Sequence, residues 1–200
     1  MKDFWDSRYG EEKEFVYGKE PNVFFADQLG NIPPGKLLLP CEGEGRNAVF
    51  AAALGWEVDA IDFSDAAREK ALAFAKDSGV NMKYYLAEIE SFKAPSEFYD
   101  AVGLVYAHFH SAKRKQIHAH LLSLLKPGGW VIMEAFSKKQ MPYKSGGPKD
   151  EEMLYDLKSI KEDFQSLKKI IFQEMMIELD EGDYHRGKAM VVRFVGKKII

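Results

Sequence analysis

The sequence predicts an α/β fold in which a mostly parallel sheet carries helices on both faces and ends in a C-terminal antiparallel hairpin. The first observation is that short apolar runs alternate with helix-like segments from residue 36 to residue 136, which is typical of a parallel sheet covered by helices. The second is that residues 170–179 and 188–195 are both extended, with no helix between them. Neighbouring strands of this kind form an antiparallel pair.

The first four predicted elements lie between residues 36 and 77. Residues 36–39 are a short apolar run bounded by prolines, which predicts a buried strand. Residues 46–54 are rich in alanine and are followed by a glycine, as expected of a helix and its C-cap. Residues 56–61 alternate between apolar and polar and predict a second strand. Ser64 then predicts the N-cap of a helix over residues 65–77.

The later elements continue the alternation. Residues 81–86 and the apolar, β-branched residues 99–106 predict two further strands. Residues 111–125 predict a helix, which a Lys-Pro-Gly-Gly turn closes before a fifth strand over residues 130–136. The polar segment 137–149 contains two prolines and two glycines and predicts a long loop at the carboxyl end of that strand. Because long loops in this position are often functional, we treat it as a candidate lid.

Composition favours one globular domain over residues 1–200. The 28 basic and 31 acidic residues give a formal charge of -3, so we expect no nucleic-acid binding. The longest stretch without a charged residue, 101–112, is too short to cross a membrane, and no apolar signal-peptide core is present. Cys41 is the only cysteine, which suits a reducing cytoplasm. With no heptad pattern in the sequence, we expect a cytoplasmic monomer.

A glycine turn joins the first predicted strand to the first predicted helix. Gly43, Gly45 and Ala48 satisfy the pattern G-x-G-x-x-G/A, and Asp62 ends the next strand 62 − 43 = 19 positions after the first of these glycines. This is the Rossmann-like nucleotide-binding arrangement, in which glycines let the backbone approach the ligand and the acid binds ribose hydroxyls. The sequence therefore predicts a nucleoside-containing cofactor at this turn.

The charge of the turn indicates which cofactor it is. Glu42 and Glu44 lie inside the turn, where their carboxylates would repel the pyrophosphate of a dinucleotide. They would favour S-adenosylmethionine, which has a ribose for Asp62, no phosphate, and both a sulfonium and an ammonium group. An NAD(P)-dependent oxidoreductase remains the alternative from another enzyme class.

Residues 37–48 resemble motif I of the class I S-adenosylmethionine-dependent methyltransferases, and residues 125–132 resemble the turn and fifth strand of that family. Residues 4–9 and 17–22 are similar to the tellurite-resistance branch and its uncharacterised bacterial relatives. The resemblance implies a seven-stranded sheet with one antiparallel strand. It also implies methyl transfer to a small-molecule nucleophile by in-line displacement. A non-catalytic protein that only binds the cofactor is a further alternative, because motif I is altered.

The alteration is that Leu39 and Cys41 stand where the family has an acid and its first glycine. Our hypothesis is that Glu42 or Glu44 replaces the lost acid near the ammonium group. By resemblance, Glu88 contacts adenine and Ile89 packs on its ring. The expected cofactor-binding residues are Tyr17, Glu42, Gly43, Glu44, Gly45, Arg46, Asn47, Asp62, Phe63, Glu88, Ile89 and Tyr106.

On the substrate side the sequence offers fewer signals. His108 follows the fourth strand and is either a general base or substrate-orienting residue, or a histidine hydrogen-bonded at the sheet edge. His118 and His120 point to different faces of a helix, so we expect surface histidines and no metal site. His185 is in the hairpin loop, which either borders the substrate pocket or, as we expect, leaves the histidine exposed. Arg8 and Arg114 are candidates for binding an anionic group of a substrate, but we expect solvated arginines, with Arg114 on a solvated helix face. Residues 1–30 are rich in aromatic side chains and are expected to cap the cofactor.

Overall fold

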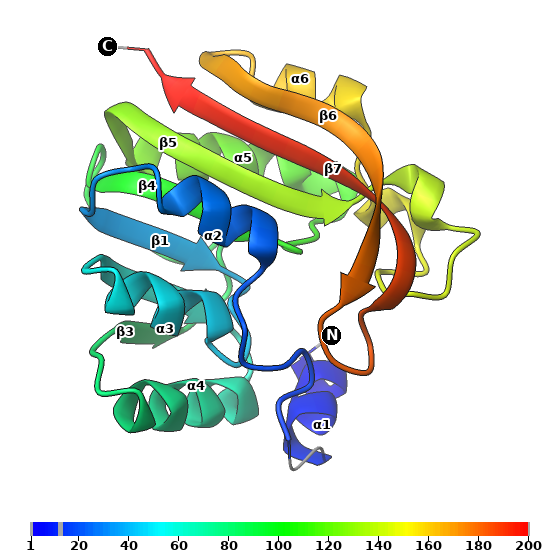
Figure 1. The fold of residues 1–200 in the computed structure, drawn as a ribbon. Coiled ribbons are helices and arrows are strands. Elements are labelled where there is room, and N and C mark those ends of the chain that lie inside the picture. Colours follow the sequence, from blue (N-terminus) through cyan, green and yellow to red (C-terminus); the bar gives the residue numbers. More distant parts are fainter. Residues whose placement is uncertain (1, 12–13, 200) are drawn as a thin grey trace.

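The protein forms one twisted seven-stranded sheet with helices on both sides (Figure 1). The computed structural model describes residues 2–11 and 14–199. The strand order is β3-β2-β1-β4-β5-β7-β6, in which β7 runs antiparallel to both of its neighbours. The strands are β1 Lys36–Pro40, β2 Glu57–Asp62, β3 Lys83–Leu86, β4 Tyr99–Val105, β5 Leu125–Phe136, β6 Leu167–Asp180 and β7 Arg186–Lys198. The predicted α/β architecture, its seven strands and its terminal hairpin are therefore confirmed.

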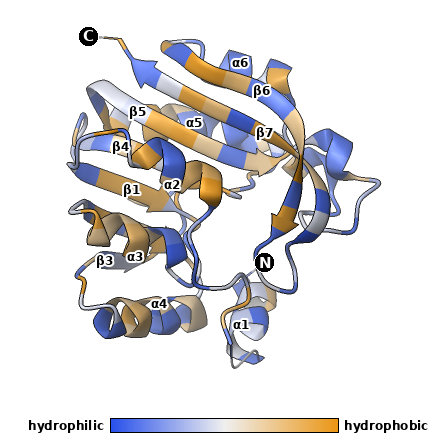
Figure 2. Cartoon of the chain, viewed as in Figure 1, coloured by the Kyte–Doolittle hydropathy of each residue, from blue (hydrophilic) through white to orange (hydrophobic). Residues whose placement is uncertain are grey.

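Two groups of helices cover the two faces of the sheet. The helices are α1 Lys2–Glu11, α2 Val23–Leu29, α3 Arg46–Ala53, α4 Asp65–Asp77, α5 Ser111–Leu124 and α6 Leu157–Asp163, with 3₁₀ turns η1 Lys138–Gln140 and η2 Glu151–Met153. Apolar residues of α2, α3 and α4 share one core with alternate residues of β1, and those of α5 and α6 share the other. Strand β1 and helix α3 are coloured mainly as hydrophobic (Figure 2).

The alternation within β1 explains why both faces are buried. Leu37 and Leu39 pack into the core beneath α2, α3 and α4, whereas Leu38 packs into the core beneath α5 and α6. Successive side chains of a strand point to opposite faces, so a continuous apolar run is what a central strand with two covered faces needs. The carboxyl ends of the parallel strands are thereby fixed at one edge, where the glycine turn lies.

Three helices, α1, α2 and α6, were not predicted from the sequence. Both α2 and α6 are only seven residues long, too short for an apolar period to be visible. Their caps are clear in the structure: the Asn22 side chain accepts a hydrogen bond from the Phe25 backbone N–H, and Asp156 forms a capping box with Ser159. Such caps each contribute about 1 kcal/mol to helix stability.

The candidate lid loop, residues 137–149, is tied to strand β7. The Gln140 side chain accepts a hydrogen bond from the Met190 backbone N–H at 2.8 Å, and the Ser145 hydroxyl donates to the Lys188 carbonyl at 2.6 Å. A Cβ at Gly146 would lie 2.6 Å from the His185 ring, so this residue must be glycine for the loop to pack there. In this structure the loop packs against strand β7 and the loop of the β6–β7 hairpin.

The N-terminal aromatic segment lies along the same edge as the glycine turn. Helix α1 packs on α4 and lies below the tip of the β6–β7 hairpin in Figure 1. The buried Tyr9 covers the turn, since a Cβ at Gly43 would lie 2.8 Å from the Tyr9 hydroxyl oxygen. Residues 1, 12 and 13 of the expected cap lie outside the described residues. Among the helices that are described, none is long and apolar enough to cross a membrane.

Candidate active site

The glycine turn has left-handed backbone at three positions. Gly43 and Gly45 have φ values of 60° and 88°, and Cys41 has φ 57° although it carries a side chain. A non-glycine residue held there stores strain of about 1 kcal/mol or more. A Cβ at Gly45 would lie 2.8 Å from the Ala71 Cβ, so this glycine also allows α3 and α4 to pack closely. Cys41 thus occupies a glycine position of the motif with the glycine conformation preserved.

Asp62 lies beside the turn with both carboxylate oxygens held. One oxygen accepts a hydrogen bond from the Gly43 backbone N–H and the other from the Ser64 backbone N–H, each at 3.0 Å. Burial raises the pKa of Asp62, against the effect of these bonds. Each carboxylate oxygen has capacity for another hydrogen bond, which is what the two hydroxyls of a ribose require. The residue fits the nucleoside role proposed for it.

The two glutamates of the turn differ in their contacts. Glu44 forms an ion pair with Lys70 at 2.8 Å and accepts a hydrogen bond from the Val16 backbone N–H at 2.8 Å, so it holds the N-terminal segment. Glu42 is buried and accepts from the Ala48 backbone N–H at 2.7 Å. Burial raises the pKa of Glu42 to about 7. A nearby cation would stabilise its ionised form. Of the pair, Glu42 is therefore our candidate for the acid that motif I has lost.

Arg46 and Asn47 begin helix α3 and hold other segments against the turn. The Arg46 guanidinium donates to the carbonyls of Tyr17 and Glu20, both at 3.3 Å, and pairs with Glu181 at 2.9 Å. The Asn47 side chain accepts from the Asn22 backbone N–H at 2.9 Å. Motif I is thus joined directly to the N-terminal segment and to the loop of the β6–β7 hairpin. The side chains of Arg46 and Asn47, which were predicted to bind the cofactor, therefore bind other segments of the protein in this structure.

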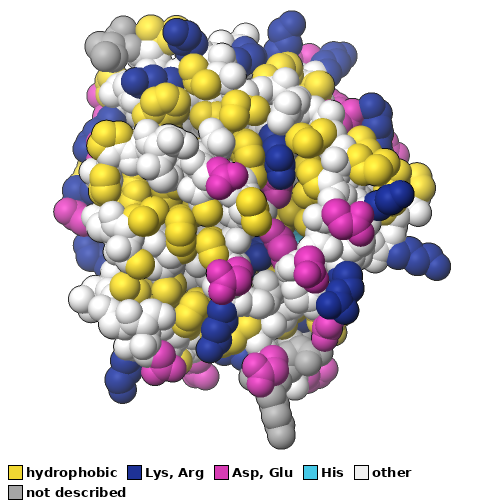
Figure 3. Space-filling view, viewed as in Figure 1, with side chains coloured by type: hydrophobic (Ala, Val, Ile, Leu, Met, Phe, Trp, Pro, Cys, Tyr) yellow, Lys and Arg dark blue, Asp and Glu magenta, His cyan; other side chains and the backbone are white. Residues whose placement is uncertain are grey.

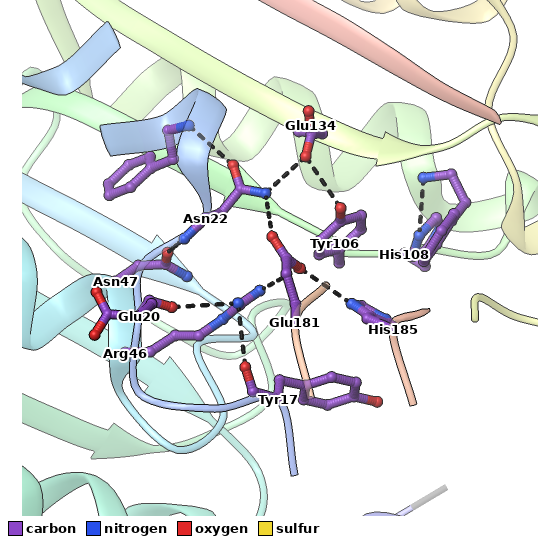
Figure 4. Close-up of polar contacts among 12 residues, drawn as sticks. Tyr17, Glu20, Asn22, Arg46, Asn47, Tyr106, His108, Glu134, Glu181 and His185 are labelled. Carbon is purple, nitrogen blue, oxygen red and sulfur yellow. Dashed lines mark hydrogen bonds and ion pairs between the residues drawn. The ribbon is translucent and has the colours of Figure 1, made fainter. Parts of the chain in front are cut away.

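A buried polar network connects these segments to the sheet (Figure 4). The Asn22 amide donates to Glu134 at 2.6 Å and to Glu181 at 3.0 Å. Glu134, at the end of β5, also accepts from the Tyr106 hydroxyl at 3.0 Å and forms an ion pair with Arg193. Asn22 and Glu134 are each 1% exposed. Groups buried to this degree must be fully paired to be tolerated, and these are.

Glu181 and His185 form a carboxylate–imidazole pair in the hairpin loop. The distance from Nδ1 of His185 to the Glu181 carboxylate is 3.3 Å. Burial favours the neutral acid, but the hydrogen bond with His185 and the Arg46 guanidinium outweigh it and lower the pKa of Glu181 to about 2. Burial, together with the positive charges of Arg46 and Arg8, lowers the pKa of His185 despite its carboxylate partner. The imidazole is therefore neutral at pH 7, with Nδ1 donating to the carboxylate.

Aromatic side chains surround this histidine. Its ring centroid lies 4.4 Å from that of Tyr17, 4.6 Å from that of Tyr106 and 5.2 Å from that of Phe136. Tyr106 follows β4 with a left-handed φ of 50°, a strained conformation at the carboxyl end of the strand. In the space-filling view, a histidine and charged side chains of both signs meet in a hollow between the hairpin and the rest of the sheet edge (Figure 3).

The structure corrects the prediction for His185. An exposed loop histidine was expected, but the residue is only 5% exposed. The hairpin loop folds back onto the sheet edge, where Arg46 and Asn22 bind Glu181. In the sequence, Glu181 and His185 are four positions apart around a glycine. Nothing in that spacing shows which way a loop turns.

His118 and Arg114 are also corrected. His118 was expected on the surface but is fully buried, with Nδ1 2.9 Å from Asp163. Arg114 was expected on a solvated helix face but is 8% exposed and donates to the Leu154 carbonyl at 3.1 Å. Both predictions were wrong because α6, which carries Asp163, was not predicted. Without that helix, the face of α5 that it covers would be open to solvent.

His108 has both ring nitrogens bound to the main chain. Nδ1 donates to the Met153 carbonyl at 2.8 Å, and Nε2 accepts from the Phe136 backbone N–H at 3.4 Å. Burial lowers its pKa to about 4. Of the two interpretations offered for His108, these contacts favour the histidine hydrogen-bonded at the sheet edge. A role as general base gains no support from them.

The remaining predicted cofactor residues lie near the same edge. Phe63 follows Asp62, and its carbonyl accepts a hydrogen bond from Lys2 at 2.9 Å. Glu88 is exposed after β3, while Ile89 is 6% exposed and packs into the core beneath α5. The core therefore fixes the position of Ile89, and the neighbouring Glu88 lies at the surface. Four further residues of the site were not predicted from the sequence: Asn22, Glu134, Glu181 and Arg193. Asn22 lies in the segment 17–22 that resembles the tellurite-resistance branch, but no spacing pattern singled it out.

Comparison with known proteins agrees with this geometry. Residues 39–129 match a methyltransferase domain family. A ubiquinone biosynthesis O-methyltransferase of Rickettsia canadensis is 32% identical over 101 residues, which span 50% of this chain and 42% of that protein. The chain thus spans less than half the length of the curated relatives it matches.

Two solved structures share the fold. One, described for the conversion of a disulfide bond into a thioacetal group during echinomycin biosynthesis, has a TM-score of 0.80 and 16% identity, covering 100% of this chain and 92% of that chain. The other is TehB from Haemophilus influenzae, with a TM-score of 0.74 and 18% identity, covering 97% of this chain and 67% of that chain.

The family match places residues 39–129 of this chain in a methyltransferase domain family, and the two solved structures share its fold. Its structural relatives include the tellurite-resistance methyltransferase TehB, as the resemblance implied. The cofactor is S-adenosylmethionine, so the preference for this cofactor over a dinucleotide is confirmed.

The ribose-binding role expected of Asp62 can be tested directly. We expect Asp62→Asn to weaken S-adenosylmethionine binding about 10- to 100-fold, because it removes a charged acceptor of hydroxyl hydrogen bonds. Isothermal titration calorimetry measures the change. Asp65→Asn is the matched control, since Asp65 is exposed and only three positions away. Equal affinities for Asp62→Asn and Asp65→Asn would show that Asp62 does not bind the ribose.

Proposed function

We propose that the protein transfers the methyl group of S-adenosylmethionine to a proton-bearing nucleophile of a small molecule, and that His185 is the general base. The observation that carries this proposal is the Glu181–His185 pair, which Arg46 connects to the motif I turn. A carboxylate that orients an imidazole through Nδ1–H leaves Nε2 as the proton acceptor. Within residues 2–11 and 14–199, the hydrogen bond of the His185 ring is made by Nδ1, and none is made by Nε2.

Each residue of the site has a separate role in the proposed reaction. The bound cofactor supplies an electrophilic methyl carbon, so the sulfur–carbon bond breaks as the bond from carbon to the nucleophile forms. His185 accepts the proton that the nucleophile loses, and Glu181 holds the imidazole in the required tautomer. The rings of Tyr17 and Tyr106 offer negative faces to a positively charged group beside them. Asp62 would hold the ribose of the cofactor, and Glu42 would hold its ammonium group.

The class of nucleophile follows from the need for a base. A hydroxyl, phenol or thiol loses a proton on methylation, whereas a nucleophile already deprotonated at neutral pH needs no base. The ubiquinone biosynthesis relative is an O-methyltransferase, and the structural neighbour TehB is a tellurite-resistance methyltransferase. Both support a small acceptor with an oxygen, sulfur or related nucleophile. Cys41 is the single cysteine of the sequence and is compatible with the cytoplasmic location that we propose for the protein.

The proposal is tested by measuring acceptor-dependent formation of S-adenosylhomocysteine. Purified protein is incubated with S-adenosylmethionine and, separately, with aliphatic thiols, thiophenols, phenols, amines and chalcogen oxyanions. We expect turnover with at least one thiol or phenol, and a methylated product in equal amount by mass spectrometry. Tight binding of S-adenosylmethionine without product from any acceptor would contradict the proposal and favour a protein that only binds the cofactor.

A further inference from the structure

The N-terminal helix α1 places one guanidinium beside the aromatic rings that surround His185. Nη1 of Arg8 lies 3.5 Å from the Tyr17 hydroxyl, and the Tyr17 ring is in contact with the His185 ring. The Arg8 guanidinium also lies over the Tyr184 ring, 4.5 Å from its centroid, and over the Phe4 ring at 4.6 Å. Arg8 is half-buried and is close enough to His185 for its charge to act on the imidazole.

The other charged groups around His185 are neutralised by partners. Arg46 is paired with Glu181, and Arg193 with Glu134. Arg8 differs, because among the described residues no carboxylate lies within ion-pair distance of it. Stacking on aromatic rings occupies the faces of a guanidinium and leaves its in-plane N–H groups for an acceptor. A half-buried cation in this state favours an anion from solution.

We propose that Arg8 forms an anion subsite and that the methyl acceptor carries an anionic group, such as a carboxylate, besides its nucleophile. The proposal rests on methyl transfer at His185 as the function. The nucleophile lies at Nε2 of His185, and the anionic group lies against Arg8 on the far side of Tyr17. The cofactor is itself positively charged at the sulfonium, so a negatively charged acceptor is further favoured in the complex.

The subsite is tested with pairs of acceptors that share a nucleophile and differ in one charge. The probes are 3-mercaptobenzoate and 3-mercaptopropionate, each compared with its methyl ester. For the wild-type protein we expect kcat/KM to be about tenfold higher for each acid than for its ester. Arg8→Met is expected to remove this preference by lowering kcat/KM for the acids alone, and Arg8→Lys to retain part of it.

Lys19→Met is the matched control, because it removes an exposed cation of the N-terminal segment that stacks on Phe15 and Phe74 instead. We expect it to leave the preference for the acids intact. Equal kcat/KM for acids and esters in the wild-type protein, or an equal loss for both in Arg8→Met, would overturn the subsite.

A binding measurement separates this proposal from the proposed function. The methylated acid, 3-(methylthio)benzoate, and its methyl ester are titrated into the protein saturated with S-adenosylhomocysteine. Arg8-dependent binding of the acid supports the subsite even if no thiol is methylated, which would contradict the proposed function alone. Methylation of both acids and esters with no Arg8-dependent binding would overturn the subsite while leaving the function standing.

Discussion

Replacing His185 by asparagine is expected to lower kcat by about 10²- to 10⁴-fold, the range that a positioned general base contributes. Asparagine keeps an N–H group that can face Glu181 but has no nitrogen lone pair to accept the proton. The pH profile provides a second signature. Because the pKa of His185 is lowered, wild-type kcat/KM should fall only below about pH 6.5, as the imidazole becomes protonated.

The His185→Asn protein should lose this acidic limb, and its activity should rise with pH as the acceptor ionises by itself. His108→Asn is the informative companion, because both nitrogens of His108 are bound to the main chain. We expect His108→Asn to lower stability while keeping the pH profile. An unchanged kcat in His185→Asn would show that His185 is not the general base. Loss of the acidic limb in His108→Asn instead would assign that role to His108.

The second large effect concerns stability. Glu134→Gln is expected to lower the free energy of unfolding by about 2–3 kcal/mol, because it leaves Arg193 without its charge partner in a largely buried position. The new amide group would also face the Asn22 amide or the Tyr106 hydroxyl, both of which donate to the present carboxylate. Urea unfolding at pH 7 measures the difference.

Glu178→Gln, an exposed glutamate on strand β6, is the matched control and should change stability by less than about 0.5 kcal/mol. A double variant, Glu134→Gln with Arg193→Met, should recover part of the loss, since no uncompensated cation remains. Equal stabilities of Glu134→Gln and Glu178→Gln would mean that the buried network does not hold the site together.

The sequence predicted the parts of this molecule that local patterns determine. The apolar run of β1, the glycines of the turn and Asp62 at the end of β2 each have a fixed spacing and a physical reason for it. Their shared edge follows from the parallel order of the strands. For this reason the fold and the cofactor were both predictable.

The substrate side was not predictable, because it depends on contacts across long separations in the chain. Asn22 contacts Glu134 and Glu181, which are 112 and 159 positions away, and a loop between two strands supplies His185. The same holds for His118, whose environment depends on a helix of seven residues. Sequence patterns report the face of one element, whereas these roles arise where several elements meet.

Methyl transfer with proton uptake by His185 is tested most directly with a labelled methyl group. The protein is incubated with S-adenosylmethionine carrying a ¹³C methyl group and a proton-bearing thiol or phenol, and both products are followed by mass spectrometry. The account predicts label in the acceptor, S-adenosylhomocysteine in equal amount, and a strongly reduced rate for His185→Asn at neutral pH. Label that stays in the cofactor with every acceptor, or transfer at the same rate in His185→Asn, would contradict it.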